Sequence, residues 1–196
     1  MSGLALEPLE HRERLGLKGP RAAQWLAANG VDLPMTPNTW TIPAGTSAAA
    51  ALLVARLGAA EFFLEEDTAG TTLKRFAPSL HEHPRGGHPP GVYPVMREDW
   101  AFLLGGERVH DVLAQVCNVN FAALPLDSRP LIMTLMIGVA VLVVPQRASE
   151  GAAAERSGPE ERQYRIWCDP TFGPYLGASL GGVVIECGGR YTGVSS

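Results

Sequence analysis

Hydrophobic residues recur with a helical period in two segments of this 196-residue chain, residues 17–27 and residues 104–114. In each segment an apolar stretch ends at a glycine turn, after which apolar side chains fall at positions i, i+3 and i+4. Each segment therefore predicts the end of a strand, a turn and an amphipathic helix. Because the two segments are 87 residues apart at every position, we predict that the chain contains a duplicated unit.

The likeness continues after each of these segments. In both repeats an apolar run and a further strand are followed by a short helix that begins at a threonine. Thr72 and Phe76 of the first repeat correspond to Thr171 and Tyr175 of the second. The offset between these pairs is 99 residues. A polar loop inserted at 146–162, which contains glycine, proline and charged residues without a hydrophobic period, explains the larger offset.

The hydrophobic pattern predicts an α+β fold, an internally duplicated antiparallel sheet with packed helices. Helices are expected at 20–29, 71–81, 107–117 and 171–180, and strands at 49–57, 61–66, 131–136, 139–144 and 163–169, with a further strand ending at 104. The alanine-rich start of 49–57 also fits a helix, but Leu53 and Val54 favour a strand. Gly138 divides the clearest hairpin, and both of its strands are expected to be fully buried.

We interpret residues 1–196 as a single duplicated domain. The first repeat spans 15–80, and the second spans 95–187 with the inserted loop at 146–162. The intervening residues 81–94 contain four prolines, three glycines and three histidines. Because such a composition does not bury enough apolar surface to form an element, these residues are expected to form a linker loop.

Composition argues against several classes of protein. The net charge is −4 and the basic residues are scattered, so no basic stripe exists to bind nucleic acid. The longest apolar run, 131–144, is too short to cross a bilayer. Residues 1–14 are acidic, unlike a secretory signal. We therefore expect no partner among nucleic acids or membranes, and a cytoplasmic location.

The sequence offers little for thiol or metal chemistry. Its three cysteines, Cys117, Cys168 and Cys187, lack a short paired spacing and fit free thiols in a reducing compartment better than disulfides or a zinc site. One cluster has the character of metal ligands: His81, Glu82, His83 and His88. Because this loop offers little rigidity to fix ligands, we interpret it as a solvated loop.

No pattern indicates a catalytic centre. The glycine pairs lack the spacing of a dinucleotide or phosphate loop, and Ser128 lacks the glycine-flanked elbow of a hydrolase nucleophile. The carboxylates of Glu65, Glu66 and Asp67 end a strand and are expected to point to solvent, while Glu98 and Asp99 lie in a turn. We predict no catalytic, cofactor-binding or metal-binding residue in this chain.

Four tryptophans offer flat rings on which a heterocycle could stack: Trp25, Trp40, Trp100 and Trp167. Large aromatic side chains at helix and strand positions more often pack in a core or an interface, and we favour that interpretation.

A set of short motifs resembles the gamma subunit of heterotetrameric sarcosine oxidase. In the first half the matching residues are Leu15-Gly16-Leu17-Lys18-Gly19-Pro20, Ala22-Ala23, Leu26, Asn38, Leu57-Gly58, Glu61-Phe62 and Leu64. In the second half they are Leu113-Ala114, Cys117, Val119 and the hairpin from Thr134 to Val144. The resemblance extends from about Leu15 to Leu180. That gamma subunit is itself similar to the folate-binding domain of the glycine-cleavage aminomethyltransferase, an α+β fold built by duplication.

The resemblance implies a role in one-carbon metabolism, the oxidative demethylation of sarcosine or a related N-methyl amine. It also implies that the larger partner subunits bind FAD, FMN, NAD and tetrahydrofolate, and that this chain binds none of them. Two carboxylates of the folate-binding relatives are missing here, because Ala59 takes the place of a glutamate in a turn and the strand segment Val139-Ala140-Val141-Leu142 is wholly apolar. Folate chemistry is therefore not expected, and the Lys-Gly-Cys motif of the iron-sulfur-associated relatives is absent.

Three functions follow as hypotheses. The first is a non-catalytic gamma-type subunit of a flavin-dependent oxidase or dehydrogenase of N-methyl amino acids, in a heterotetramer with larger flavin-binding subunits. Trp40, Tyr93 and Trp167 are the residues expected to contact those partners, because aromatic side chains concentrate at interface hot spots. The alternatives are a folate-dependent one-carbon transferase or folate-binding protein, and a small-molecule binding module that uses the tryptophans.

Overall fold

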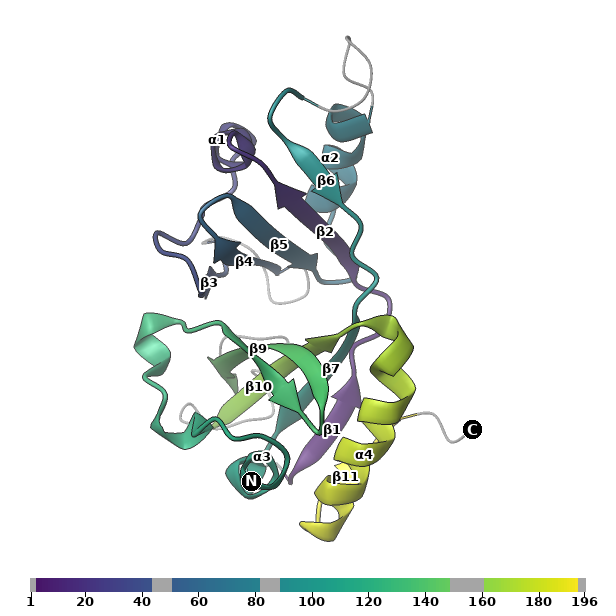
Figure 1. Cartoon of the computed structure of the whole chain (residues 1–196). Coiled ribbons are helices and arrows are strands. Elements are labelled where there is room, and N and C mark those ends of the chain that lie inside the picture. Colours follow the sequence, from purple (N-terminus) through teal and green to yellow (C-terminus); the bar gives the residue numbers. More distant parts are fainter. Residues whose placement is uncertain (1–2, 44–50, 82–88, 149–160, 194–196) are drawn as a thin grey trace. The chain divides into compact units, whose positions relative to one another are not determined.

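The computed structural model describes residues 3–43, 51–81, 89–148 and 161–193. The chain forms two compact units (Figure 1). The first-repeat unit contains residues 11–97, and the second-repeat unit contains residues 1–10 together with residues 98–196. The boundaries therefore lie at 10/11 and 97/98, and the chain begins in the second-repeat unit before it builds the first.

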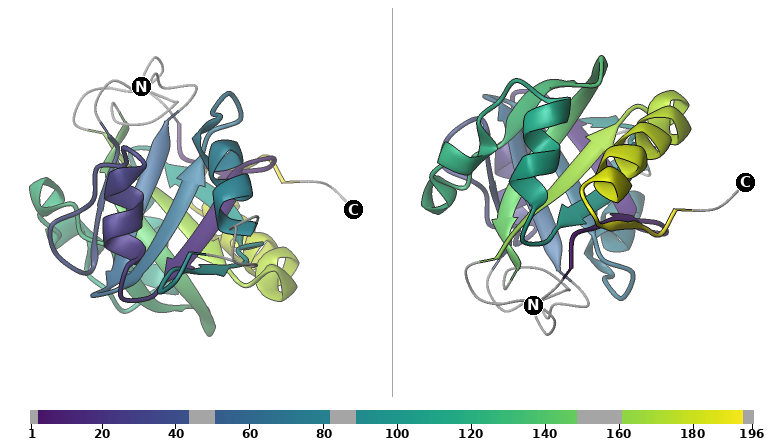
Figure 2. Two further views of the ribbon diagram at one scale, coloured as in Figure 1. Left: turned by 90° about the horizontal axis from the view of Figure 1, so that it is seen from above. Right: turned by 90° about the horizontal axis from the view of Figure 1, so that it is seen from below.

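The first-repeat unit is a five-stranded antiparallel sheet with two helices. Its elements are β2 (Glu13–Lys18), α1 (Ala22–Ala28), β3 (Thr39–Thr41), β4 (Leu52–Gly58), β5 (Glu61–Glu66), α2 (Thr72–His81) and β6 (Tyr93–Val95). Helices α1 and α2 lie on the same face of the sheet (Figure 2, left). Alternate strand residues such as Val54, Phe62 and Leu64 pack there against Leu26 and Phe76.

The second-repeat unit is a six-stranded sheet covered by α3 and α4 (Figure 2, right). Its elements are β1 (Ala5–Pro8), β7 (Trp100–Gly105), α3 (Val109–Val116), the 3-10 turns η2 (Phe121–Ala123), η3 (Leu126–Ser128) and η5 (Pro170–Phe172), β8 (Ile132–Met136), β9 (Val139–Arg147), β10 (Arg162–Cys168), α4 (Gly173–Glu186) and β11 (Arg190–Tyr191). The core between sheet and helices is separate from that of the first-repeat unit.

The two units repeat one topology. The strand order is β3-β4-β5-β2-β6 in one sheet and β8-β9-β10-β7-β1-β11 in the other. Helix α1 follows β2 as α3 follows β7, and α2 follows β5 as α4 follows β10. The predicted α+β class is therefore confirmed, with one sheet for each repeat, and all strand pairs are antiparallel except β1 with β11.

The two repeats exchange one strand each. In the first-repeat sheet the exchanged strand is β6, beside β2, and in the second-repeat sheet it is β1, beside β7. β1 directly precedes β2 in the chain but pairs with β7, whereas β6 directly precedes β7 but pairs with β2. β1 and β6 are themselves related by the 87-residue spacing, since residues 6–8 correspond to residues 93–95. Each repeat thus supplies this strand to the sheet of the other.

Gly19 and Gly106 occupy equivalent places in the two repeats. Their φ angles are +121° and +118°, a region that residues with a side chain rarely adopt. A Cβ at Gly19 would collide with the backbone of Gly91, and a Cβ at Gly106 would lie 2.5 Å from Leu4 Cα. Gly91 and Leu4 are also 87 residues apart, so the duplication is preserved in the contact that each glycine makes with the chain entering the exchanged strand.

The four predicted helices are present with shifted ends. The largest difference is α4, which continues past Leu180 through Gly181 and Gly182 to Glu186. Glycine normally weakens a helix, but a Cβ at Gly181 would lie 2.5 Å from the Tyr191 ring. The close packing that this glycine permits against β11 compensates for its poor helix propensity, and a local pattern does not reveal it.

Three predictions about strands and loops are wrong. The hairpin is formed, but β8 is an edge strand whose alternate residues Met133 and Leu135 are 58% and 60% exposed, so its predicted full burial fails. The linker predicted at 81–94 ends in a strand, because Tyr93 and Pro94 belong to β6 and pair with β2. Proline is tolerated there because β6 is also at an edge. Gln146, Arg147 and Arg162, assigned to the inserted loop, likewise belong to strands.

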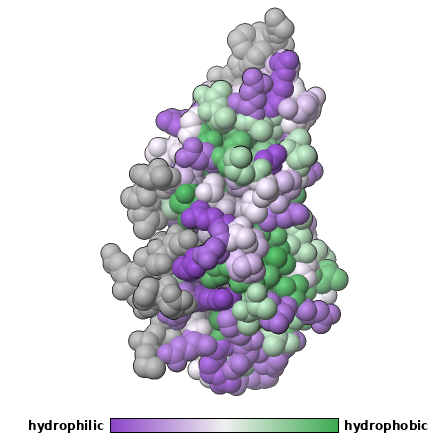
Figure 3. All heavy atoms as spheres, turned by 90° about the vertical axis from the view of Figure 1, so that its left-hand side faces the viewer, coloured by the Kyte–Doolittle hydropathy of each residue, from purple (hydrophilic) through white to green (hydrophobic). Residues whose placement is uncertain are grey.

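The face in Figure 3 shows hydrophobic side chains interspersed among hydrophilic ones. The large hydrophobic side chains exposed over the described residues are Met35, Tyr93, Met96, Trp100, Met133, Leu135, Phe172, Tyr175 and Ile185. Among the helices described, none has the length and apolar character needed to span a membrane.

Candidate functional site

A pocket of about 440 Å³ lies in the second-repeat unit, along α3 and the loop that leads to η2. Its polar lining comes from His110, Asp111, Asn118 and Asn120. Its apolar lining comes from Leu113, Ala114, Val119, Phe121 and Ala122, with Cys117 at the end of α3. This mixture of a mostly apolar wall and a few polar groups is typical of small-molecule sites.

Arg162 holds the loop that forms one wall of the pocket. Its Nη1 donates to the carbonyl oxygens of Phe121, Ala122 and Leu124 at 3.2, 3.2 and 3.3 Å. These carbonyls belong to a 3-10 turn and the residue after it. One guanidinium nitrogen of a residue at the start of β10 therefore contacts three carbonyls of this loop.

His110 is the titratable side chain most closely tied to this pocket. Its Nε2 lies 2.7 Å from the hydroxyl of Tyr164 in β10, and the Tyr164 ring packs edge to face on Phe121 with centroids 5.4 Å apart. Burial and the Arg162 charge lower the pKa of His110 below its ordinary value, although the Asp111 carboxylate opposes this. Burial raises the pKa of Tyr164, so both rings are neutral near pH 7.

The lowered pKa of His110 predicts a loss of stability in mild acid. Below the ordinary value of 6.5, the unfolded chain takes up a proton at this ring more readily than the folded chain does. The free energy of unfolding is therefore expected to fall as the pH decreases from about 6.5 towards the folded-state value. Urea unfolding at pH 7.5 and 5.5 measures the change.

His110→Gln serves as the comparison, since glutamine keeps a hydrogen-bonding partner for Tyr164 but does not titrate. The difference in stability between the two pH values is expected to be smaller in the variant. An equal difference in both proteins would show that other groups cause the pH dependence.

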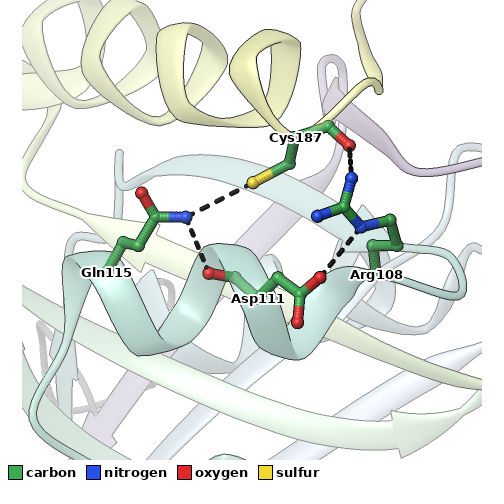
Figure 4. Close-up of polar contacts among 4 residues, drawn as sticks. All are labelled: Arg108, Asp111, Gln115 and Cys187. Atoms are coloured by element: carbon green, nitrogen blue, oxygen red, sulfur yellow. Dashed lines mark hydrogen bonds and ion pairs between the residues drawn. The ribbon is translucent and has the colours of Figure 1, made fainter.

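Polar contacts join the outer side of α3 to the end of α4 (Figure 4). Arg108 donates through Nε to the Asp111 carboxylate at 2.8 Å and through Nη1 to the Cys187 carbonyl at 2.7 Å. Gln115 Nε2 donates to the Asp111 carbonyl at 2.9 Å and approaches Cys187 Sγ at 3.3 Å. Asp111 is thus partly neutralised by Arg108, which leaves His110 and the two asparagines as the polar groups for a ligand.

The cysteines are free, as expected, and all three are buried. Cys117 Sγ lies 3.6 Å from Thr134 Oγ1. Burial, with smaller contributions from Asp169 and Asp99, raises the pKa of Cys168 to about 11. A thiol in that environment stays protonated and is a poor nucleophile.

The sequence-based candidates for chemistry do not come together. Of the histidine cluster, Glu82, His83 and His88 lie outside the described residues, as does the side chain of His81. Within the part that the structure describes, no three His, Cys, Asp or Glu side chains form a metal-binding group. Ser128 Oγ donates to the Pro125 carbonyl at 2.8 Å, in a turn rather than at a nucleophile elbow.

The tryptophans do not form a stacking site. Trp25 packs edge to face on Phe76, and Trp100 is partly exposed. Trp40 and Trp167 are each 1% exposed, so the prediction that they contact a partner is wrong. Tyr93, on the edge strand β6, is exposed, and its role stays a prediction.

The prediction that the carboxylates at the end of β5 point to solvent is also wrong. Glu65, Glu66 and Asp67 are all buried. Arg14 donates to Glu65 at 2.7 Å, and Arg12 forms an ion pair with Asp67. Glu66 accepts from the backbone N–H groups of Thr72 and Leu73 at 2.8 and 2.9 Å. These carboxylates are buried because each has a structural partner.

Glu66→Ala is expected to lower the free energy of unfolding by about 2–3 kcal/mol, because it leaves two N–H groups at the start of α2 without their acceptor. The loss is measured by urea unfolding. Glu61→Ala is the control, since Glu61 makes partly exposed ion pairs with Lys18 and Arg97, worth roughly 0–1 kcal/mol. Equal losses in the two variants would contradict the capping role.

The two positions at which the resemblance implies that carboxylates are missing have other surroundings here. Ala59 lies in the exposed turn between β4 and β5, and its carbonyl accepts from Arg56 Nη2 at 3.1 Å. Arg56 also donates to the carbonyls of Pro34, Met35 and Gly58. Val139 and Val141 pack into the core under α3 and α4. Neither place presents an acidic group.

Two glutamines are buried on the sheet face opposite to α3 and α4. Gln146 and Gln163 are directly opposite each other on β9 and β10. Both amide atoms of Gln146, and Nε2 of Gln163, have no hydrogen-bond partner among the described residues. Gln146 was predicted to lie in the inserted loop. The register between β9 and β10 places it opposite Gln163.

His110, Tyr164 and Arg162 were missed as candidate site residues. In the sequence, Tyr164 is the first inward-facing residue of a strand with alternating faces, and the same pattern is typical of an ordinary core residue. His110 showed as a polar residue of a helix. The pairing of an α3 residue with a β10 residue 54 positions later leaves no local signal.

Comparison with known proteins identifies the fold. No protein-family model matches the sequence, and no curated protein matches it. Among solved structures, a chain of the heterotetrameric sarcosine oxidase from Corynebacterium sp. U-96, in complex with pyrrole 2-carboxylate, matches with a TM-score of 0.64 and 20% identity. The match covers 97% of this chain and 87% of that one.

The glycine cleavage system aminomethyltransferase T from Bartonella henselae matches with a TM-score of 0.60 and 18% identity over 92% of this chain. This chain spans only 46% of the length of that protein. The resemblance read from the sequence motifs is confirmed in the fold: the chain has the duplicated α+β architecture found in a sarcosine oxidase subunit and in the aminomethyltransferase.

Proposed function

We propose that this chain is a non-catalytic, gamma-type subunit of a cytoplasmic, heteromeric flavin-dependent enzyme that oxidises sarcosine or a related N-methyl amino acid. One observation carries the proposal. The match to the sarcosine oxidase chain spans nearly the whole of both chains, at 97% and 87%, whereas this chain spans 46% of the aminomethyltransferase. The described fold thus corresponds to nearly all of a chain that works in an assembly, and to about half of the transferase.

The two positions at which folate-binding relatives carry carboxylates support the non-catalytic role. Ala59 and the segment from Val139 to Leu142 offer no side-chain acceptor for the amino groups of a pterin and no charge to stabilise a developing cation. In this proposal FAD, FMN, NAD and tetrahydrofolate are bound by the larger partner subunits, and this chain contributes to assembly.

Co-expression with flavin-binding subunits, where such subunits are encoded beside its gene, tests the proposal. Native mass spectrometry is expected to show a hetero-oligomer that contains this chain and oxidises sarcosine or another N-methyl amino acid. The isolated chain is expected to carry no flavin absorbance. A chain that stays separate from those subunits would overturn the proposal.

Titration calorimetry of the isolated chain with tetrahydrofolate distinguishes the proposed subunit role from the alternative of a folate-binding protein. No heat of binding is expected at millimolar ligand. Measurable binding would favour a folate-dependent transferase or folate-binding protein instead.

The pocket beside His110 favours a second candidate function, that of a small-molecule binding module. Its volume of about 440 Å³ and its mixed lining fit a small, partly apolar molecule with hydrogen-bonding groups. Chemical-shift changes of the His110 ring on addition of candidate N-methyl amines test this function. An unchanged spectrum at millimolar concentration would count against it.

A further inference from the structure

Tyr164 and Arg162 fix which ring nitrogen of His110 carries its proton. Tyr164 is wholly buried, and its hydroxyl lies 2.7 Å from His110 Nε2. Burial raises the pKa of Tyr164, and a hydrogen bond from Arg162 opposes that rise. Because a guanidinium donates hydrogen bonds and accepts none, the Tyr164 oxygen is the acceptor there and its hydrogen is left for another group. Among the described residues that group is His110 Nε2. The neutral ring of His110 therefore carries its proton on Nδ1.

The Nδ1–H group of His110 is a donor that the fold leaves available. His110 is half-buried and lines the pocket. Within the described ranges its hydrogen bond is the one between Nε2 and Tyr164, and Nδ1 has no partner of its own. A donor in a half-buried position has lost part of its hydration, so an acceptor on a ligand gains by pairing with it.

The charges near the pocket favour an anionic acceptor. Burial and then the positive charge of Arg162 lower the pKa of His110, and Asp111 has the smaller, opposite effect. Arg108 Nε lies 2.8 Å from the Asp111 carboxylate and offsets its charge. Arg162 also donates to the Phe121 carbonyl in the pocket wall. Two arginines and one aspartate therefore leave an excess of positive charge beside the Nδ1–H donor.

The rest of the pocket suits a ligand with an apolar body. Leu113 and Ala114 of α3 and Val119 of the following loop line it. Asn118 and Asn120 add side-chain amides, whose NH₂ groups are donors. The volume of about 440 Å³ is at the small end of the range for ligand sites. A carboxylate matches this set, because its two oxygens accept from two donors while its carbon chain contacts the apolar wall.

We propose that the pocket beside His110 binds a small carboxylate with an apolar body, and that His110 donates from Nδ1 to one carboxylate oxygen. The asparagine amides at the same pocket serve the second oxygen, and Leu113 contacts the apolar body. Carboxylate binding rests on the second candidate function, the small-molecule binding module, and specifies the ligand of that module. It does not depend on the subunit role.

NMR of the His110 ring nitrogens tests the assignment of the donor. The Nδ1–H form is expected to predominate in the unliganded chain at pH 7.5. Tyr164→Phe removes the hydroxyl that selects this form, so a larger share of the Nε2–H form is expected in the variant. A ring of the unaltered chain that is mainly in the Nε2–H form would overturn the assignment.

Titration with three probes of matched length tests the ligand class: hexanoate, hexanamide and hexylamine. The ring signals of His110 and calorimetry follow the binding. Hexanoate is expected to bind with saturation at millimolar concentration, and hexanamide at least about tenfold more weakly, because hydrogen bonds to a charged acceptor are the stronger ones. Hexylamine is expected to cause no saturable change, since its positive charge is repelled by the arginines.

His110→Phe keeps an aromatic ring but has no donor, and is expected to weaken hexanoate binding at least about tenfold, as measured by calorimetry. It also leaves the buried Tyr164 hydroxyl without its acceptor. The double variant His110→Phe/Tyr164→Phe removes both partners together, so it is expected to stay folded and to show the same loss of binding. Met133→Ala, on an exposed edge strand of the same sheet, is the control and is expected to bind hexanoate like the unaltered chain. Circular dichroism checks the folding of each variant.

Three results would overturn carboxylate binding at His110. Hexanamide or hexylamine that binds as tightly as hexanoate would leave the binding module intact but refute its ligand class. Unchanged affinity for hexanoate in the folded double variant would place the site elsewhere. Absence of binding by all three probes at millimolar concentration would refute the binding module as well. The subunit role is tested separately, by co-expression.

Discussion

Gly106→Ala is expected to be strongly destabilising, because it alters the point where the exchanged strand β1 enters the second-repeat sheet. The φ angle of +118° excludes alanine without strain, at a cost of about 1–3 kcal/mol. The new Cβ would also lie 2.5 Å from Leu4 Cα and 2.7 Å from Leu4 N. Because both atoms are backbone, relief requires the chain to move, and overpacking adds a further ~1–3 kcal/mol. The free energy of unfolding in urea measures the loss.

Gly30→Ala separates the two causes of that loss. Gly30 also has a positive φ angle, +78°, but a Cβ there would meet no atom within 4 Å. Its replacement is expected to cost about 1–2 kcal/mol from the backbone alone. Gly19→Ala, the equivalent change in the first repeat, is expected to match Gly106→Ala. If Gly106→Ala costs no more than Gly30→Ala, the close approach to Leu4 is not important.

Leu6→Ala is expected to lower the free energy of unfolding by about 2–5 kcal/mol, the usual range for removing a buried leucine side chain. Leu6 is wholly buried in β1, between β11 and β7, and belongs to the core beneath α3 and α4. The expected loss is confined at first to the second-repeat unit, although the residue precedes the first repeat in the chain. Urea unfolding gives the total, and hydrogen exchange of the β7 amides gives its location.

Leu135→Ala is the matched control for this change. Leu135 is 60% exposed on the edge strand of the same sheet, so its replacement is expected to change stability by less than about 0.5 kcal/mol. Faster exchange in β2 rather than β7 after Leu6→Ala would show that β1 stabilises the first-repeat unit, contrary to the observed pairing.

The elements that follow from neighbouring residues were predictable. The turns at Gly19 and Gly106 and the helices after them have local signals, since glycine permits the backbone and the apolar period marks the buried side. The hairpin at Gly138 is also local, because β8 and β9 pair directly across it. The 87-residue spacing of these signals indicated the duplication without any knowledge of the sheets.

The environments of side chains were harder to predict. Glu65 and Glu66 read as solvent-facing carboxylates, because their partners are an arginine 51 residues earlier and a helix start six and seven residues later. Trp40 and Trp167 were expected to contact a partner subunit, although both are buried within this chain. The candidate site was missed because His110 and Tyr164 are far apart in the sequence, and only their contact in the folded chain indicates a site.

By itself, the sequence determined the duplication, the α+β class, the helices and the hairpin, because these depend on the period of apolar residues and on glycine at turns. Only the tertiary structure decided that β1 and β6 are exchanged between the repeats. It also decided that His110 meets Tyr164 beside a pocket. Strand partners and contacts between distant residues depend on which surfaces bury one another, and the free energy of that burial comes from the whole fold rather than from any one segment.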